Sequence, residues 1–361
     1  MADVQPFHAV RYSGAAGALD DLVAPPYDAI SNEERARLAA RSPFNVVRLT
    51  LPDSADEAAG LYRSWLEDGI LVREEAPAPW LLVEEYVGPD GVARERHGIV
   101  ISIAAEPYST GAVLPHERTH PKIRDERLEL LRATGVQLEP IFLLADRALE
   151  IAVPARDPDL RADGARLWRL SGVDTHRVAG DGELLIADGH HRYESTLEFA
   201  AETGPAGARM MALVVSTEDP GLQVFPTHRF FSGRLDLAGL REGEQCNGLE
   251  DALARLAAEP VTRSAAVAYR PGHVELIRGR DGELDVELVD RHGLEGIGYT
   301  PVAADAADGV DSGRADVAFL VRAPRVEDVF AVARRGERMP QKSTYFFPKP
   351  LSGLLFHPLE P

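Results

Sequence analysis

Apolar and polar residues alternate along the chain in short blocks of two different periods. Apolar residues at helical spacing predict helices over 33–41, 56–69, 122–132, 193–202, 249–258 and 326–335. Short apolar runs predict strands over 45–49, 80–86, 95–103, 140–145, 183–187, 211–216, 224–231 and 315–322. A further strand pair is predicted at 265–277 and 283–289, joined by the turn 278–282. Strands and helices mixed in this way predict a mixed α/β fold.

Local signals support several of these boundaries. Ser31 followed by Glu34 has the spacing of a capping box at the start of the first helix. The turn 88–91 (Gly-Pro-Asp-Gly) predicts that 80–86 and 95–103 form a hairpin. Gly336 after the last helix is typical of a helix stop.

The composition limits the classes of partner. The 361 residues carry a formal net charge of −19, which disfavours nucleic acids and anionic membrane surfaces as partners. A lone cysteine, Cys246, excludes an intramolecular disulfide and a multi-cysteine metal site. No apolar run approaches the roughly 20 residues of a membrane span, and the start does not resemble a secretory signal. We therefore expect a cytoplasmic protein, and the oligomeric state stays open.

The segment 184–194 (Leu-Leu-Ile-Ala-Asp-Gly-His-His-Arg-Tyr-Glu) carries the clearest chemical signal. An apolar strand leads into a glycine turn and directly into a helix, whose first N–H groups have no intrahelical partner and attract anions. Gly189 allows a close backbone approach, and Arg192 is suited to a bidentate contact with phosphate. Asp188 is a candidate ligand for a metal ion or a hydroxyl. The competing interpretation is that Asp188 only caps the helix while His190 and His191 lie on a solvated face.

These residues resemble the nucleotide-binding signature of the free serine kinases, which share the ParB/sulfiredoxin-like fold. The segments Leu-Pro-His-Glu (114–117), 315–324 and Lys-Ser-Thr (342–344) are similar in the same chain order. With the N-terminal motif Ala-Pro-Pro-Tyr-Asp (24–28), nearly the whole chain resembles the bacterial family DUF1015. The resemblance implies a ParB/sulfiredoxin-like nucleotide-binding core over 106–220, an extra N-terminal α/β unit over 1–105, and a C-terminal α/β part over 221–361 that completes the site.

The resemblance also implies residue roles for a kinase that transfers phosphate from ATP or ADP, with Mg²⁺, to a small hydroxylated metabolite. Glu117 would be the base that takes the proton of the acceptor hydroxyl. Asp188 and His190 would join it in catalysis, with Asp188 also a candidate Mg²⁺ ligand. Phosphate would be bound by Gly189, His191, Arg192, Thr134, Gly135, Lys342, Ser343 and Thr344. His116 is a candidate substrate contact. His228 and Arg229 are further candidates on other grounds, because the compact basic element 225–229 fits a contact with phosphate or carboxylate.

A purely structural role is the alternative for several candidate residues outside 188–192. Thr134 and Gly135 also suit a simple helix terminator, and Glu117 also suits a surface ion pair. For His228 and Arg229 the alternative is an exposed edge strand. The kinases have a basic pair of the Arg-His type that helps to bind the amino-acid substrate, and this chain has Tyr-Phe-Phe (345–347) in its place. The resemblance therefore favours a serine-like acceptor without specifying serine itself.

Three other functions compete with the kinase. A nucleotide-binding switch without catalysis is possible in the ParB-like fold, although the chain lacks a basic DNA-binding segment. A metal-dependent hydrolase would use Glu117 with the histidines at 116, 120, 190 and 191, but Pro121 disrupts the helical spacing that such a motif needs. A sulfiredoxin-like reductase would need a cysteine within 188–192, and none is there.

Overall fold

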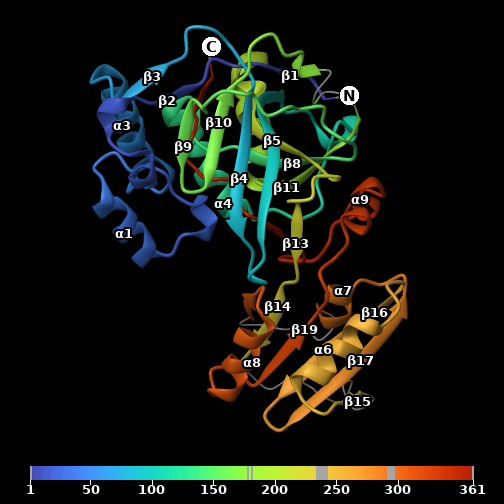
Figure 1. The fold of residues 1–361 in the computed structure, drawn as a ribbon. Coiled ribbons are helices and arrows are strands. Elements are labelled where there is room, and N and C mark those ends of the chain that lie inside the picture. Colours follow the sequence, from blue (N-terminus) through green and yellow to red (C-terminus); the bar gives the residue numbers. More distant parts are fainter. Residues whose placement is uncertain (1, 177–178, 180–181, 233–242, 291–296, 360–361) are drawn as a thin grey trace. The chain divides into compact units, whose positions relative to one another are not determined.

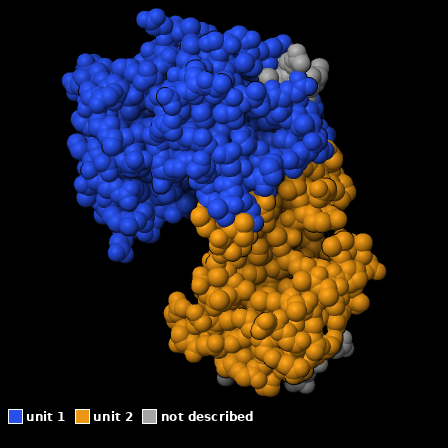
Figure 2. Space-filling view, viewed as in Figure 1, with its two compact units in different colours: residues 1–86, 93–222, 348–361 blue, residues 87–92, 223–347 orange. Residues whose placement is uncertain are grey.

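The computed structural model describes residues 2–176, 179, 182–232, 243–290 and 297–359. These residues form two compact units, which Figure 2 shows in different colours. The first unit contains residues 1–86, 93–222 and 348–361, and the second contains 87–92 and 223–347. Across the described ranges, no helix combines the length and the apolar character that crossing a membrane requires.

A mixed sheet forms the centre of the first unit (Figure 1). Its strands follow the order β6 (Val113–Leu114), β11 (Leu184–Asp188), β8 (Ile141–Ala145), β12 (Arg209–Ser216), β5 (Ala93–Ala104), β4 (Trp80–Val87), β10 (Ala165–Arg169) and β9 (Leu160–Ala162), and β1 (Val4–Gln5) also pairs with β5. β12 runs parallel to β8 and antiparallel to β5, whereas β11 is antiparallel to β8. Alternate residues such as Ile141 and Leu143 face one hydrophobic core, to which Tyr193 also contributes.

The N-terminal segment builds a second core within the same unit. It contains β2 (Val10–Tyr12), β3 (Leu71–Arg73) and the helices α1 (Asn32–Arg41), α2 (Val47–Thr50) and α3 (Ala55–Glu67). Tyr12 and Tyr62 pack there against Phe356, which comes from the other end of the chain, and Trp65 packs against Tyr12. β21 (His357–Pro358) pairs with β7 (Val136–Gln137), so the last residues of the chain are part of the first unit.

Two helices of the first unit run side by side in the same direction. α4 (Pro121–Thr134) and α5 (His190–Thr203) are joined near their starts by the Ser195 hydroxyl, which donates to the Arg124 carbonyl at 2.8 Å. Farther along, Arg132 forms an ion pair with Glu202. The two N-termini therefore lie at the same end of the pair, and so do the two C-termini.

The second unit has its own antiparallel sheet with helices on both faces. The strand order is β15 (Glu244–Gln245), β17 (His273–Asp281), β16 (Arg263–Arg270), β19 (Val317–Leu320), β14 (His228–Phe231) and β18 (Ile297–Thr300), and β13 (Gln223–Phe225) pairs with β20 (Tyr345–Phe347). One face packs against α6 (Leu249–Ala258) and α8 (Ala303–Asp311), and the other packs against α7 (Asp285–Asp290). α9 (Val326–Arg334) follows β19 in the chain.

Most of the predicted elements are confirmed, including the mixed α/β class and all six predicted helices. The Ser31 hydroxyl accepts a hydrogen bond from the Glu34 N–H at 3.2 Å, as the capping signal predicted. α5 begins at His190, three residues earlier than expected, so the basic residues of the turn lie in its first turn.

Two strand predictions are wrong. Residues 47–50 form the one-turn helix α2, because the Asn45 side chain accepts from the Val47 N–H and donates to the carbonyls of Asp21 and Val23. These tertiary contacts outweigh the β-propensity of the valines. The strand pair predicted at 265–277 and 283–289 instead turns at Gly272 to form β16 and β17, and 285–290 is the helix α7.

Candidate functional site

The predicted strand–glycine–helix turn is present in the first unit. β11 ends at Asp188, Gly189 adopts φ 101°, and α5 begins at His190. A Cβ atom on residue 189 would lie 2.7 Å from Cγ2 of Ile141 and 3.1 Å from an Arg192 nitrogen. Glycine is therefore required here both by the left-handed backbone and by the close approach of neighbouring side chains.

The N-termini of α4 and α5 both lack the usual neutralising groups. Neither helix has a side-chain cap, and neither has an acidic residue in its first turn. Every other described helix of at least eight residues carries Asp or Glu in its first turn. In a chain with a net charge of −19, these two adjacent helix starts are exceptions, because neither has an acidic residue in its own first turn to oppose the positive end of the helix dipole.

Both histidines of the turn accept hydrogen bonds from the segment that precedes α4. Nε2 of His190 accepts from the His116 N–H at 3.3 Å, and Nε2 of His191 accepts from the His120 N–H at 2.8 Å. An accepting nitrogen carries no proton, so both rings are neutral in this arrangement. Burial lowers the pKa of His191, and the positive charge of Arg192 adds to the effect. The two histidines therefore hold the 116–120 segment against the start of α5.

Glu117 lies on this segment, directly after His116. The His116 ring is fully buried, and its Nδ1 donates to the Ile186 carbonyl at 2.7 Å. The rings of His116 and His190 meet edge to face at 4.8 Å. Glu117 itself is half-buried. Its backbone is thereby held beside the first turn of α5, whereas His116 is enclosed by protein.

Asp188 is held between two cations. One oxygen accepts from Nη2 of Arg192 at 2.7 Å, and the other lies 2.8 Å from Nζ of Lys349. Arg192 is buried, and its Nη1 donates to the Pro140 carbonyl at 2.5 Å. Both terminal nitrogens of Arg192 are thus engaged within the protein, and the bidentate phosphate contact stays a prediction.

The N-terminal motif contributes to the same region. Asp28 lies in the 3₁₀ turn η3 (Tyr27–Ala29), and its carboxylate is 2.6 Å from Nζ of Lys349. The Tyr27 N–H donates to the buried carboxylate of Glu139 at 3.0 Å. Arg127 of α4 stacks over the Tyr27 ring at 4.2 Å. Burial raises the pKa of Tyr27 to about 12.

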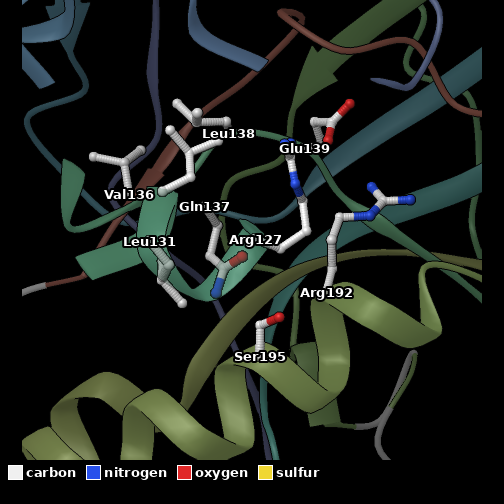
Figure 3. Close-up of a pocket in the computed structure, with 9 residues that line it drawn as sticks. Arg127, Leu131, Val136, Gln137, Leu138, Glu139, Arg192 and Ser195 are labelled. Carbon is white, nitrogen blue, oxygen red and sulfur yellow. The ribbon is translucent and has the colours of Figure 1, made fainter. Parts of the chain in front are cut away.

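A small cavity lies behind Arg192, between α4, α5 and residues 136–139 (Figure 3). Arg192 and Ser195 project into this region from α5, and Gln137 and Glu139 reach it from the neighbouring segment. Its volume is about 30 Å³, which is the space of about one water molecule. It is too small for a nucleotide.

A larger groove of about 550 Å³ lies along α4, near the starts of α1 and α3. Three of its lining residues are acidic, namely Asp53, Glu126 and Glu129. Of its two arginines, Arg35 forms an ion pair with Asp53, and Arg127 donates to the Thr50 carbonyl. A polyphosphate would be repelled there, so the size of the groove does not make it a phosphate site.

Thr134 and Gly135 lie at the other end of α4 from the 188–192 turn. The Thr134 hydroxyl donates to the Leu130 carbonyl at 2.8 Å. Gly135 has φ 65°, and its N–H donates to the Leu131 carbonyl. A helix of this length spans roughly 20 Å. These contacts are those of a helix terminator, and they do not bring the pair to the start of α5.

The remaining predicted residues belong to the second unit. His228 and Arg229 are buried in β14, an interior strand, so the alternative of an exposed edge strand is wrong. Nδ1 of His228 accepts from the Val321 N–H, and Arg229 forms an ion pair with Asp290. Their contacts account for them structurally.

The Lys-Ser-Thr segment also belongs to this unit. The Ser343 hydroxyl donates to the Pro340 carbonyl at 2.6 Å. Lys342 has φ 55° and an exposed side chain. For Lys342, Ser343 and Thr344, the contribution to phosphate binding stays a prediction.

The residues at the turn do not suit a protein-bound metal ion. Within the described part of the chain, no group of three or more His, Cys, Asp or Glu side chains is arranged to hold one. Asp188, the candidate Mg²⁺ ligand, has each oxygen engaged with a cationic side chain. α4 begins only at Pro121, so His116 and His120 do not share a helix face. A metal-dependent hydrolase of the kind considered from the sequence would need both histidines on one helix turn.

Sequence reasoning did not identify Lys349 as part of the site. Its surroundings, a Pro-rich aromatic segment, gave no helix or strand signal. One signal was nevertheless present: the chain has only three lysines among its 39 basic residues. This rarity alone does not separate Lys349 from Lys122, whose side chain is 80% exposed. Glu139, which binds Tyr27 and Ser352, was also missed, because its partners are far away in the sequence.

Together, the fold and the site define a mixed α/β protein built around a strand–glycine–helix turn, with a second parallel helix beginning beside it. The chain belongs to the DUF1015 family, described as proteins of unknown function, whose family model matches residues 4–291.

Comparison with characterised proteins finds serine kinases. The chain is 24% identical over 180 residues to the ADP-dependent L-serine kinase SerK of Thermococcus kodakarensis, covering 46% of this chain and 69% of that protein. A solved free serine kinase in complex with AMP is 20% identical, with a TM-score of 0.42, and covers 68% of this chain and 86% of its own. SbnI of Staphylococcus aureus, solved with a C-terminal truncation, is 13% identical, with a TM-score of 0.44 and coverages of 72% and 87%.

Proposed function

We propose that this protein is a nucleotide-dependent phosphotransferase that acts on a small hydroxylated metabolite, with a serine-like acceptor favoured. The donor is ATP or ADP, and the core of the first unit has the ParB/sulfiredoxin-like fold. The sequence similarity to an ADP-dependent L-serine kinase supports the choice of reaction.

One observation carries the proposal. The uncapped starts of α4 and α5 lie side by side, and the segment bearing Glu117 is hydrogen-bonded across them. Unpaired N–H groups at helix starts bind phosphates, and a carboxylate beside them suits a general base. Phosphoryl transfer depends mainly on such positioning and on electrostatic stabilisation.

In this mechanism, the N–H groups of the first turn of α5 bind the terminal phosphates. Glu117 accepts the proton of the acceptor hydroxyl as its oxygen attacks the terminal phosphorus of the nucleotide. The bond from that phosphorus to the bridging oxygen breaks, and ADP leaves when ATP is the donor, or AMP when ADP is the donor. His190 and His191 act by holding the 116–120 segment, because their Nε2 atoms already accept hydrogen bonds from it. The Asp188 carboxylate at the end of β11 holds the side chains of Arg192 and Lys349 beside the start of α5 by ion pairs.

Mg²⁺ would accompany the nucleotide and neutralise its phosphates. Because the side chains at the turn do not suit a metal site of their own, no residue of this chain is assigned to hold the ion. In the alternative function, a nucleotide-binding switch without catalysis, the start of α5 also binds the phosphates, but Glu117 has no catalytic role.

The test is a comparison of wild type with Glu117→Gln. The protein is incubated with Mg²⁺, labelled ATP or ADP, and a panel of hydroxylated metabolites that includes serine. We expect wild type to form a phosphorylated product and Glu117→Gln to form it about 10² to 10⁴ times more slowly, with nucleotide affinity unchanged. Glu129→Gln, an exposed carboxylate of α4, is the matched control and should behave as wild type.

Two outcomes count against the proposal. Folded wild-type protein that binds nucleotide but forms no product with any acceptor would favour the switch. Folded protein that binds neither ATP nor ADP would exclude both functions.

A further inference from the structure

Lys349 is placed at the candidate site by the C-terminal segment of the chain. The Ser352 hydroxyl donates to the Glu139 carboxylate at 2.6 Å, and Ser352 pairs with Ala24 through backbone hydrogen bonds. Phe356 is fully buried in the N-terminal core. Because the residues that follow Lys349 are anchored to Ala24, to Glu139 and in the N-terminal core, the ammonium has little freedom to move away.

The ammonium group lies between two carboxylates. Nζ is 2.6 Å from Oδ2 of Asp28 and 2.8 Å from Oδ1 of Asp188, and the side chain is 18% exposed. Burial alone would lower the pKa of Lys349, but the charges of Asp188 and Asp28 outweigh burial and raise it. The group therefore stays charged over the whole physiological pH range.

This arrangement resembles the way carboxylates bind a small divalent cation. Mg²⁺ in nucleotide enzymes is commonly bound by one or two carboxylates together with the phosphates. Here the oxygens of Asp28 and Asp188 converge on an ammonium, and the second oxygen of Asp188 faces Arg192. Lys349 contacts Asp188 directly, and Asp188 lies two residues before the start of α5. The ammonium is therefore connected to the helix start through a single carboxylate.

We propose that Lys349 is the fixed cation of this site, so that a nucleoside diphosphate binds at the start of α5 without a divalent ion held by the protein. Lys349 occupies the position between Asp28 and Asp188 and shields the incoming phosphates from both carboxylates. This inference rests on the proposed function, because it assumes that the start of α5 binds phosphate.

The test uses the full-length protein, ADP, and isothermal titration calorimetry in EDTA and in excess Mg²⁺. We expect wild type to bind ADP under both conditions with affinities within about threefold. Lys349→Met should bind at least about tenfold more weakly in EDTA, as expected when a charged hydrogen-bonding group is lost. Lys349→Arg should retain most of the affinity. Arg63→Met, which changes an exposed basic side chain on α3 away from the site, is the matched control.

A second measurement does not depend on nucleotide. Removing the ammonium leaves Asp28 and Asp188 facing each other, so Lys349→Met should acquire a Mn²⁺ site that wild type lacks. Free Mn²⁺ is measured by electron paramagnetic resonance, and thermal unfolding with and without Mn²⁺ shows whether the variant is folded. Should Lys349→Met unfold, the double variant Asp28→Asn/Lys349→Met is used in the calorimetry instead. It also removes one of the two carboxylates that would otherwise repel each other.

The outcomes separate this inference from the proposed function. Wild type that binds ADP only with Mg²⁺ overturns the fixed-cation role but leaves the kinase proposal intact. Equal binding by wild type and Lys349→Met in EDTA also overturns it. Wild type that binds no nucleotide under either condition overturns the proposed function, and the role of Lys349 in nucleotide binding falls with it.

Discussion

His191 on α5 and His120 at the start of α4 are joined by a 2.8 Å hydrogen bond from the backbone N–H of His120 to Nε2 of His191. The bond connects two segments that are 71 residues apart in the sequence. It fixes the start of one helix against the start of its parallel neighbour, and with it the segment that bears Glu117.

Replacing His191 tests whether it positions this segment or binds phosphate itself. We expect His191→Ala to lose about 1 kcal/mol of unfolding free energy, because the His120 N–H loses its acceptor. His191→Gln places an oxygen close to the position of Nε2 and should recover most of the loss. Urea unfolding measures both variants. A large loss of nucleotide affinity with unchanged stability would instead assign His191 to the phosphate.

Gly189→Ala should destabilise the protein by about 1–3 kcal/mol or more. The backbone has φ 101°, and the added Cβ would meet Ile141 at 2.7 Å. Gly135→Ala provides the comparison, because Gly135 has φ 65° but nothing lies within 4 Å of its Cβ position. It should cost only about 1 kcal/mol. Equal losses of unfolding free energy for the two variants would contradict the steric argument.

Thr134→Val should weaken the end of α4 without changing the affinity for nucleotide. The hydroxyl of Thr134 donates to the Leu130 carbonyl, and its removal should cost about 1 kcal/mol of stability. Chemical unfolding and ADP titration of the same preparation check the two statements. A tenfold loss of affinity at unchanged stability would support the phosphate contact implied by the family resemblance.

Acid should destabilise both units through buried histidines. Burial lowers the pKa of His228 in the second unit, and that of His357 in the first, to about 4 from the usual 6.5. Between these values the unfolded state binds more protons, so the unfolding free energy falls as the pH drops from 6.5 towards 4. Each histidine contributes on the order of 3 kcal/mol to this loss.

For each of these two histidines, the test variant is chosen by which ring nitrogen forms the hydrogen bond in the folded protein. Nδ1 of His228 accepts from the Val321 N–H, so His228→Asn retains an acceptor there. Nε2 of His357 lies 2.9 Å from the Ser102 hydroxyl, so His357→Gln retains a partner for it. Both should flatten the dependence of unfolding free energy on pH between 6.5 and 4. An unchanged slope would show that other groups cause the acid sensitivity.

Arg96→Met should destabilise the first unit by about 3–5 kcal/mol. Arg96 is fully buried, forms an ion pair with Glu84 on the neighbouring strand, and stacks on Phe142. Burial raises the pKa of Glu84 even with Arg96 beside it, so an unpaired carboxylate there would be costly. The double variant Glu84→Gln/Arg96→Met should recover much of the loss in thermal or urea unfolding. Without such recovery, the loss would have to be assigned to packing.

The sequence by itself determined the local elements of the site. The apolar run 184–187, the glycine and the helix that follows are specified within about ten residues, because strand burial, a left-handed turn and helix periodicity are short-range properties. The sequence also determined the six predicted helices, and motif similarity placed the chain in its family.

Only the tertiary structure decided which side chains meet at the turn. Lys349 reaches Asp28 across 321 residues of sequence, and the N–H of His116 reaches His190 across 74. Even a local element was overridden where Asn45 bonds the carbonyls of Asp21 and Val23 and 47–50 becomes helical. Such contacts depend on how strands are ordered and where the chain returns. Residue periodicity carries no information about either, since it describes only neighbours along the chain.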